Sequence, residues 1–146
     1  MKSKTQEAKH FLLQLKKTDK LIKNKLIEKE QWKSIAMGTS AQMGGERVQS
    51  SGSQQKMADA VERYIDIEAE IDRYIDRLID TKKDVISVIE QLDATEYDLL
   101  HVVYVQYLTL EEFAEKYDRS YRWATSVHGR ALQNVQRILD KREMIS

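Results

Sequence analysis

The chain contains no cysteine and no proline, and glycine occurs only five times in 146 residues. Without cysteine there can be neither a disulfide bond nor a thiolate metal site, a composition that suits a reducing compartment. Without proline, helices can continue without the break imposed by its ring and its missing N–H. Four of the five glycines lie between residues 38 and 52. This is therefore the stretch where we expect helical structure to be interrupted.

Long apolar segments are missing as well. No run approaches the roughly 20 apolar residues that span a bilayer, and Met1 is not followed by the apolar core of a signal peptide. We therefore predict a soluble, cytoplasmic protein with no membrane partner. Apolar residues make up 41% of the chain and charged residues 33%. This balance favours an elongated helical protein over one large compact core.

The net charge is zero, but its distribution is uneven. Residues 1–33 carry ten lysines and four acids, a net of +6, and residues 57–98 carry thirteen acids and five bases, a net of −8. A zero total does not exclude DNA binding, because the local field matters. We expect a Lys-rich helix from Thr5 to about Ile35, packed antiparallel beside an acidic helix. It would neutralise the aspartates spaced four residues apart there, which are Asp72, Asp76, Asp80 and Asp84.

A longer helix is predicted from Gln55 to Leu92, about 57 Å at 1.5 Å per residue. Its apolar seam alternates by three and four residues. The seam has two polar interruptions, Glu68 and Lys82. Its members are Val61, Tyr64, Glu68, Ile71, Ile75, Leu78, Lys82, Val85, Ile89 and Leu92. Flanking apolar residues widen this face beyond what one helix covers, which predicts either a homodimer through this helix or docking of the C-terminal helices on it. The two helices and a Gly/Ser-rich loop near 38–54 form a first domain, residues 1–92.

Residues 93–146 are predicted to form a separate domain of three helices. Thr95 can cap the first of them, over Glu96–Leu108. A short amphipathic helix follows over Thr109–Tyr117, because its apolar residues recur at spacings of three and four. Ser120 is a natural N-cap for the last helix, since its hydroxyl can accept an unpaired backbone N–H.

The last helix has two different sides. The small or apolar residues Ala124, Val127 and Ala131 allow two helices to cross closely and steeply, as in a helix-turn-helix, whose second helix enters the major groove. The opposite side carries polar or small groups suited to base edges. The predicted base-reading residues are Arg122, Tyr121, Thr125, Ser126 and Gln133. Arg122 is the leading candidate, through a bidentate contact with guanine.

Residues 119–142 carry six cationic side chains and one acid, a net of +5, which favours phosphate contact. The predicted phosphate-binding residues are Arg119, Arg130 and Arg137. Two residues depart from the common form of the motif. Asp118 stands where many such turns carry glycine, and Arg119 stands where an apolar residue is common. Gly129 costs the helix about 1 kcal/mol against alanine and marks either a close approach of the DNA backbone or local fraying.

The last two helices resemble region 4 of the sigma-70 family, which reads the promoter −35 element. The resemblance rests on the pattern S-x-x-x-A-x-x-V-x-x-x-A-L over residues 120–132 and on the preceding LTLEEFAEKY. In addition, VQSSGSQQKMADAVERYIDIEAEID, which begins at Val48, resembles small phage and prophage late-gene regulators of the RinA/ArpU type. Together the two resemblances cover about two thirds of the chain.

The patterns and the resemblance predict an all-α fold, with a long antiparallel helical hairpin followed by a C-terminal three-helix helix-turn-helix domain. The resemblance implies a sequence-specific regulator of phage or prophage type that binds double-stranded DNA. It further implies action at promoters together with host RNA polymerase.

Catalytic patterns are weak. The pairs Glu7–His10 and Asp98–His101 have the spacing found in di-iron bundles, but the other inward carboxylates of that design are missing. No G-K-[ST] follows the glycines at 44 and 45, so they form no phosphate loop. We therefore predict no enzyme, no metal site and no cofactor. The alternative function is a helical protein–protein interaction or adaptor module that carries a degenerate helix-turn-helix.

Overall fold

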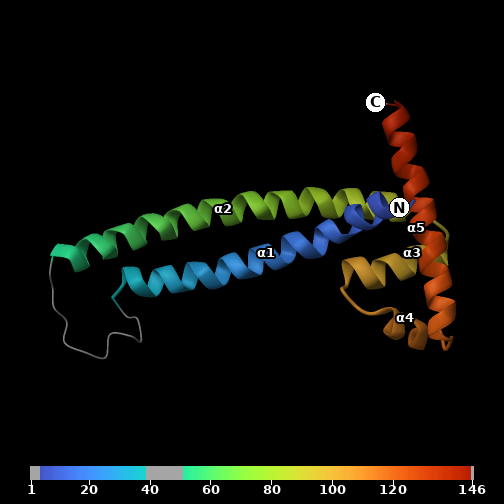
Figure 1. Cartoon of the computed structure of the whole chain (residues 1–146), viewed down its shortest axis with the longest axis horizontal. Coiled ribbons are helices and arrows are strands. Elements are labelled where there is room, and N and C mark those ends of the chain that lie inside the picture. Colours follow the sequence, from blue (N-terminus) through green and yellow to red (C-terminus); the bar gives the residue numbers. More distant parts are fainter. Residues whose placement is uncertain (1–3, 39–50, 146) are drawn as a thin grey trace. The chain divides into compact units, whose positions relative to one another are not determined.

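The computed structural model describes residues 4–38 and 51–145, and every regular element within them is helical. In chain order (Figure 1) these are α1 (Gln6–Ala36), α2 (Ser51–Ile89), α3 (Ala94–Leu100), the π-helical turn η1 (His101–Val105), α4 (Leu110–Lys116) and α5 (Tyr121–Ile145). The all-α class predicted from the sequence is therefore correct. No helix in the described ranges combines the length and the apolar character needed to cross a membrane.

The predicted loop near 38–54 is only partly described, since residues 39–50 lie outside the described residues. Gly38 follows α1 with a positive φ of 68°, a conformation that glycine adopts without steric cost. Residues 51–54 were predicted to belong to the loop but form the first turn of α2. Because no proline interrupts it, α2 extends across these small and polar residues.

The chain divides into two compact units. Unit 1 comprises residues 1–17 and 78–146, and unit 2 comprises residues 18–77. Helices α1 and α2 each contribute residues to both units. Unit 1 thus contains, in addition to α3–α5, residues 1–17 and 78–92, which the sequence assigned to a first domain.

Unit 2 consists of two antiparallel helical segments that share a narrow apolar contact. Ile22 of α1 and Ile67 and Ile71 of α2 are buried there. Beside this contact, the ammonium of Lys25 lies 3.0 Å from a Glu70 carboxylate oxygen, and that of Lys29 lies 3.2 Å from Glu68. Residue numbers thus rise along α1 as they fall along α2, as in an antiparallel pair.

One expectation about these helices is correct in part, and another is wrong. The predicted seam of α2 is buried at Ile71, Val85 and Ile89 but exposed at Val61 and Ile75, while Ile67, which the seam did not include, is fully buried. The lysines of α1 do not neutralise the predicted series of aspartates. Asp84 pairs instead with Arg142 of α5, at 2.8 Å. In the described part of the chain no ion pair reaches the three others, Asp72, Asp76 and Asp80.

Unit 1 has a larger core to which all its helices contribute. Leu12 of α1, Val85 and Ile89 of α2, Phe113 of α4 and Val127 of α5 are fully buried in one apolar cluster. The cluster continues with Ala8, Leu15, Val88, Leu99, Leu100, Val102, Tyr104, Ala114, Ala124, Ala131, Leu132 and Val135. The predicted docking of the C-terminal helices on the long helix is thus confirmed for its last turns.

The helix predicted over Glu96–Leu108 has different limits. It is capped by Asp93, whose carboxylate accepts the Glu96 N–H at 2.9 Å, and not by Thr95. The extended backbone at Asp93 places its side chain over the free N–H groups of the first turn. After Leu100 the α-helical turns widen to the π-helical turn η1, which ends at Val105.

The turn between α4 and α5 is held by backbone hydrogen bonds. Asp118 has a φ of +53°, and the N–H of Arg119 donates to the Ala114 carbonyl at 2.9 Å while that of Asp118 donates to Glu115 at 3.0 Å. This pair of bonds is the Schellman arrangement that ends many helices. Ser120 then caps α5 as predicted, because its hydroxyl accepts the Trp123 N–H at 3.1 Å.

Candidate nucleic-acid interface

Helix α5 has one buried and one exposed side. Ala124, Val127 and Ala131 are 0% exposed and pack into the core of unit 1. About half a turn away, the side chains of Arg122 and Ser126 are exposed. Helix α5 is therefore amphipathic, with its packing on one side and hydrogen-bonding groups on the other.

The predicted base-reading residues take different environments. Arg122, Ser126 and Gln133 are exposed, and within the described residues no hydrogen bond or ion pair occupies their side chains. Tyr121 is 52% exposed at the first position of α5. Thr125 is half-buried, and its hydroxyl donates to the Arg122 carbonyl at 2.8 Å. Its proton is therefore already used within the helix.

Aromatic stacking holds one predicted phosphate-binding residue in place. The guanidinium of Arg119 lies 4.9 Å from the centre of the Trp123 ring, a cation–π contact. Trp123 in turn stacks on Phe113, with ring centres 5.6 Å apart and planes 5° from parallel. Trp123 is half-buried against the core of unit 1. Its position leaves Arg119 exposed beside the start of α5.

The other two predicted phosphate-binding residues are also exposed, but both interact with unit 1 itself. Arg137 donates a hydrogen bond to the Asn134 amide oxygen at 3.1 Å. The charge of Arg130 acts on Asp93, whose pKa is lowered first by the hydrogen bond from the Glu96 N–H and then, among smaller effects, by Arg130.

A buried carboxyl group, which the sequence did not indicate, lies behind α5. Glu96 is 5% exposed and accepts a hydrogen bond from the Asn134 amide at 2.6 Å. Burial is the main reason that its pKa is raised. Only the three-dimensional structure brings Asn134 to this carboxyl group, because 38 positions separate the two residues.

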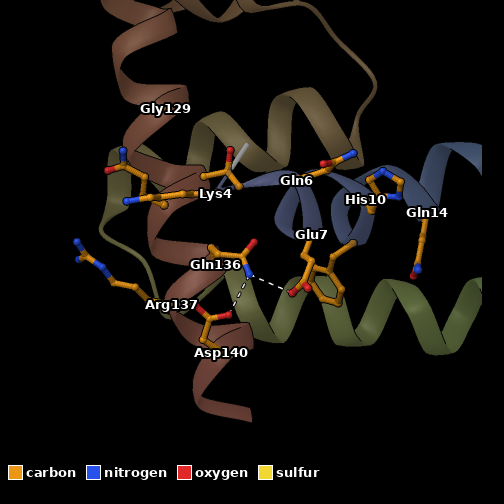
Figure 2. A pocket seen from close by; sticks show the side chains of 12 residues that line it. Lys4, Gln6, Glu7, His10, Gln14, Gly129, Gln136, Arg137 and Asp140 are labelled. Atoms are coloured by element: carbon orange, nitrogen blue, oxygen red, sulfur yellow. Dashed lines mark hydrogen bonds between the residues drawn. The ribbon is translucent and has the colours of Figure 1, made fainter. Parts of the chain in front are cut away.

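The start of α1 lies against the second half of α5, which the sequence also did not indicate. The Ala8 N–H donates to the Gln136 amide oxygen at 2.9 Å, and the Gln136 amide N–H group donates to Glu7 at 3.1 Å and to Asp140 at 3.0 Å. Figure 2 shows the bonds from Gln136 to Glu7 and to Asp140 at the edge of a cleft of about 1150 Å³. The cleft is lined by Lys4, Thr5, Gln6, Glu7, His10, Phe11, Gln14, Gly129, Gln133, Gln136, Arg137 and Asp140.

One histidine of α5 is turned toward the core. The Nε2 atom of His128 lies 2.7 Å from the Tyr104 hydroxyl. Burial, followed by the charge of Lys9, lowers the pKa of His128, and burial raises the pKa of Tyr104 to about 12. Near pH 7 the tyrosine therefore keeps its proton and the imidazole is neutral, and the tautomer of His128 decides which of the two groups donates the hydrogen bond.

The carboxylates of the two di-iron-like sequence pairs are occupied by other groups. Asp98 accepts hydrogen bonds from the Lys116 ammonium at 2.9 Å and from the Tyr117 hydroxyl at 2.5 Å. Glu7 is bonded to Gln136, as described above. The described residues bring together no group of three or more potential metal ligands.

Taken by its chemistry, the exposed side of α5 offers hydrogen-bond donors and positive charge on a rigid helix. Such a surface can contact base edges and phosphates. No protein-family model matches this chain, and comparisons with curated proteins and with solved structures found no match.

Proposed function

We propose that this protein is a sequence-specific DNA-binding regulator without enzymatic activity, in which α4, the turn at Asp118 and α5 act as a helix-turn-helix. One observation carries the proposal. Arg122, Ser126 and Gln133 stand exposed and unpartnered on α5, while the opposite side of the same helix is fully buried. A helix fixed in this way can enter a major groove without loss of its packing.

In this proposal Arg122 reads a guanine, and Tyr121 and Ser126 contact neighbouring groups in the groove. Arg119, Arg130 and Arg137 bind phosphates and fix the register of the helix on the duplex. Gln133 lies further along α5, at the cleft beside the start of α1.

The regulatory part of the proposal has a different support. Action at phage or prophage promoters, together with host RNA polymerase, is supported by the resemblance of the last two helices to region 4 of the sigma-70 family. The three helical segments α3–η1, α4 and α5 correspond in this reading to the three helices of that domain, and α1 and α2 to the preceding hairpin.

A homodimer is part of the same proposal. Val61, Ile65 and Ile75 are 44%, 56% and 39% exposed along α2 of unit 2, and a second copy of the chain would cover them. A dimer would present two α5 helices to two half-sites, which raises the effective concentration of the second contact after the first has formed.

The test is a binding titration with fluorescently labelled duplexes, after selection of preferred sequences from a random pool. The wild-type protein should bind with a steep negative dependence of log K on log salt. Arg122→Ala should lose about 1–3 kcal/mol at one preferred site and little on random DNA, whereas Arg130→Ala should weaken binding to all sequences alike. Arg73→Ala, which removes an exposed arginine from α2, is the matched control and should bind as the wild type does.

Two outcomes would contradict the proposal. Equal losses on preferred and random DNA for both α5 variants would remove the assigned roles. An affinity almost independent of salt, or no binding to any duplex, would favour the adaptor function instead, for which the exposed apolar residues of α2 are the supporting observation.

A further inference from the structure

The cleft between the start of α1 and the second half of α5 borders the proposed DNA-binding side of α5. Two residues with assigned contacts, Gln133 and Arg137, line it together with Gly129, and Lys4 lines it from the other wall. Every residue of the cleft belongs to unit 1. The cleft is therefore a fixed feature of the unit that carries the proposed recognition helix.

Packing within the described part of the protein does not explain why residue 129 is a glycine. Helix α5 continues without a break from Tyr121 to Ile145, so local fraying does not account for the glycine. A Cβ atom built at Gly129 would meet no heavy atom of a neighbouring element within 4 Å. Glycine lowers helix stability relative to alanine, and no contact in the described residues requires it. The open space above it is available to a ligand that approaches the helix closely.

The charges of the cleft are separated. The carboxylates of Glu7 and Asp140 both accept hydrogen bonds from the Gln136 amide. In Figure 2 the side chains of Lys4 and Arg137 extend to one side of α5, away from this bonded group. Lys4 is exposed, and Arg137 has only one of its five N–H groups committed, to Asn134. Lys4 and Arg137 therefore make one side of the cleft cationic, while Glu7 and Asp140, which are also exposed, lie on the side bonded to Gln136.

The position of Lys4 relative to α5 is fixed by the helix that follows it. The Ala8 N–H is bonded to Gln136, and Ala8 and Leu12 are 0% exposed in the core of unit 1. A lysine ahead of such an anchored helix loses less freedom on binding than a lysine in an unattached segment.

We propose that this cleft binds the sugar-phosphate backbone of the DNA that α5 reads, with a phosphate between Lys4 and Arg137 and the strand passing over Gly129. This inference rests on the proposed function and adds a second wall to its site. Because phosphate contacts carry no sequence information, the cleft sets the register and orientation of α5 and adds affinity for every sequence.

The experiment measures binding of the full chain to a preferred duplex and to random duplex DNA over a series of salt concentrations. Lys4→Ala should weaken binding to both by about three- to tenfold and reduce the slope of log K against log salt by about one. Lys17→Ala is the matched control, because it removes an exposed lysine of α1, in the same unit, that does not line the cleft. It should leave both affinities and the slope unchanged.

Gly129→Ala provides an independent readout. Alanine should raise the melting temperature by about 2–4 °C, because it favours the helix and meets no neighbour. The same variant should weaken binding to both duplexes, since its methyl group keeps the strand away from the helix. A gain in stability together with weaker binding is a combination that damage to the fold cannot produce.

The inference and the proposed function fail in different ways. The proposed backbone-binding role of the cleft is overturned if Lys4→Ala binds as Lys17→Ala does, or if Gly129→Ala keeps full affinity, while Arg122→Ala still loses affinity at the preferred site. The proposed function is overturned if the wild-type protein shows no salt-dependent binding to any duplex.

Discussion

The two units of the chain differ in how far they bury their apolar residues. Among the described residues, unit 1 buries seventeen of them in one cluster, whereas unit 2 buries Ile22, Ala60, Ile67 and Ile71. Each unit leaves seven large hydrophobic side chains exposed, so the exposed ones outnumber the buried ones in unit 2 but not in unit 1. Those of unit 2 are Leu26, Ile27, Ile35, Met37, Val61, Ile65 and Ile75. Since burial of apolar surface is the main source of stability, unit 1 can hold a rigid binding surface, and unit 2 gains most from a partner.

The largest expected effect comes from matched truncations of the two cores. Leu12→Ala in unit 1 should cost about 2–5 kcal/mol of unfolding free energy, because the cavity lies in a closely packed cluster. Ile71→Ala in unit 2 should cost about 1–2 kcal/mol, since Ile71 is 6% exposed and its surroundings can relax. Urea unfolding followed by circular dichroism measures both. Similar losses for both variants would show that the two cores are equally tight.

The next effect concerns assembly through unit 2. Ile65→Asp should raise the dissociation constant of the proposed homodimer by at least about tenfold, because an interface aspartate would lose hydration without gaining a partner. Sedimentation equilibrium over a range of concentrations measures this. Leu13→Asp is the control, since Leu13 is 47% exposed on α1 of unit 1. A wild-type chain that stays monomeric at tens of micromolar would leave the exposed residues of unit 2 without the proposed partner.

The pH dependence should separate the two units. Burial lowers the pKa of His128 in unit 1, so below its ordinary value of 6.5 the unfolded chain binds more protons and unit 1 loses stability as the pH falls. In unit 2 the hydrogen bonds from Lys29 and Lys25 lower the pKa values of Glu68 and Glu70. Their contribution is present above 4.5, the ordinary value, and is lost only as the pH falls below it.

The two tryptophans can follow the units separately, because Trp123 lies in unit 1 and Trp32 in unit 2. With Trp32→Phe as background, the fluorescence melting midpoint of unit 1 should fall between pH 7 and pH 5, and His128→Gln should remove part of that fall. The variant is necessary because the buried Glu96, with its raised pKa, acts in the opposite direction over part of this range. An unchanged profile in His128→Gln would assign the acid sensitivity to another group.

Local signals in the sequence predicted much of unit 1. The cap at Ser120, the burial of Ala124, Val127 and Ala131, and the exposure of Arg122 all follow from spacing within one helix and its first turn. Each of these features depends on only a few neighbouring residues, so a pattern in the sequence is enough to predict it.

The features that the sequence missed depend on distant pairs. The bond from Ala8 to Gln136 joins residues 128 positions apart, and the pair of Asp84 and Arg142 spans 58. The spacing of apolar residues along one helix does not predict which other helix a side chain will contact. The exposure of the seam residues Val61 and Ile75 has the same origin, since apolar residues on more than one side of α2 fit a helical repeat and only packing against α1 selects which are buried.

The smallest expected effects concern the residues that follow the ends of helices in the two units. Gly38 in unit 2 has a φ of +68°, and Asp118 in unit 1 adopts +53° with a side chain that disfavours it. Asp118→Gly should raise the unfolding free energy by about 0.5 kcal/mol, because relief of strain exceeds the extra entropy of the unfolded glycine. Gly38→Ala should lower the unfolding free energy by about 1 kcal/mol, although its Cβ would make only ordinary contact with Met57, at 3.5 Å.

Asp118→Ala is the control and should be less stable than the wild type, since alanine lacks the polar side chain that makes this conformation tolerable for aspartate. If thermal melts show Asp118→Gly below Asp118→Ala, the carboxylate contributes more to the turn than the backbone strain costs.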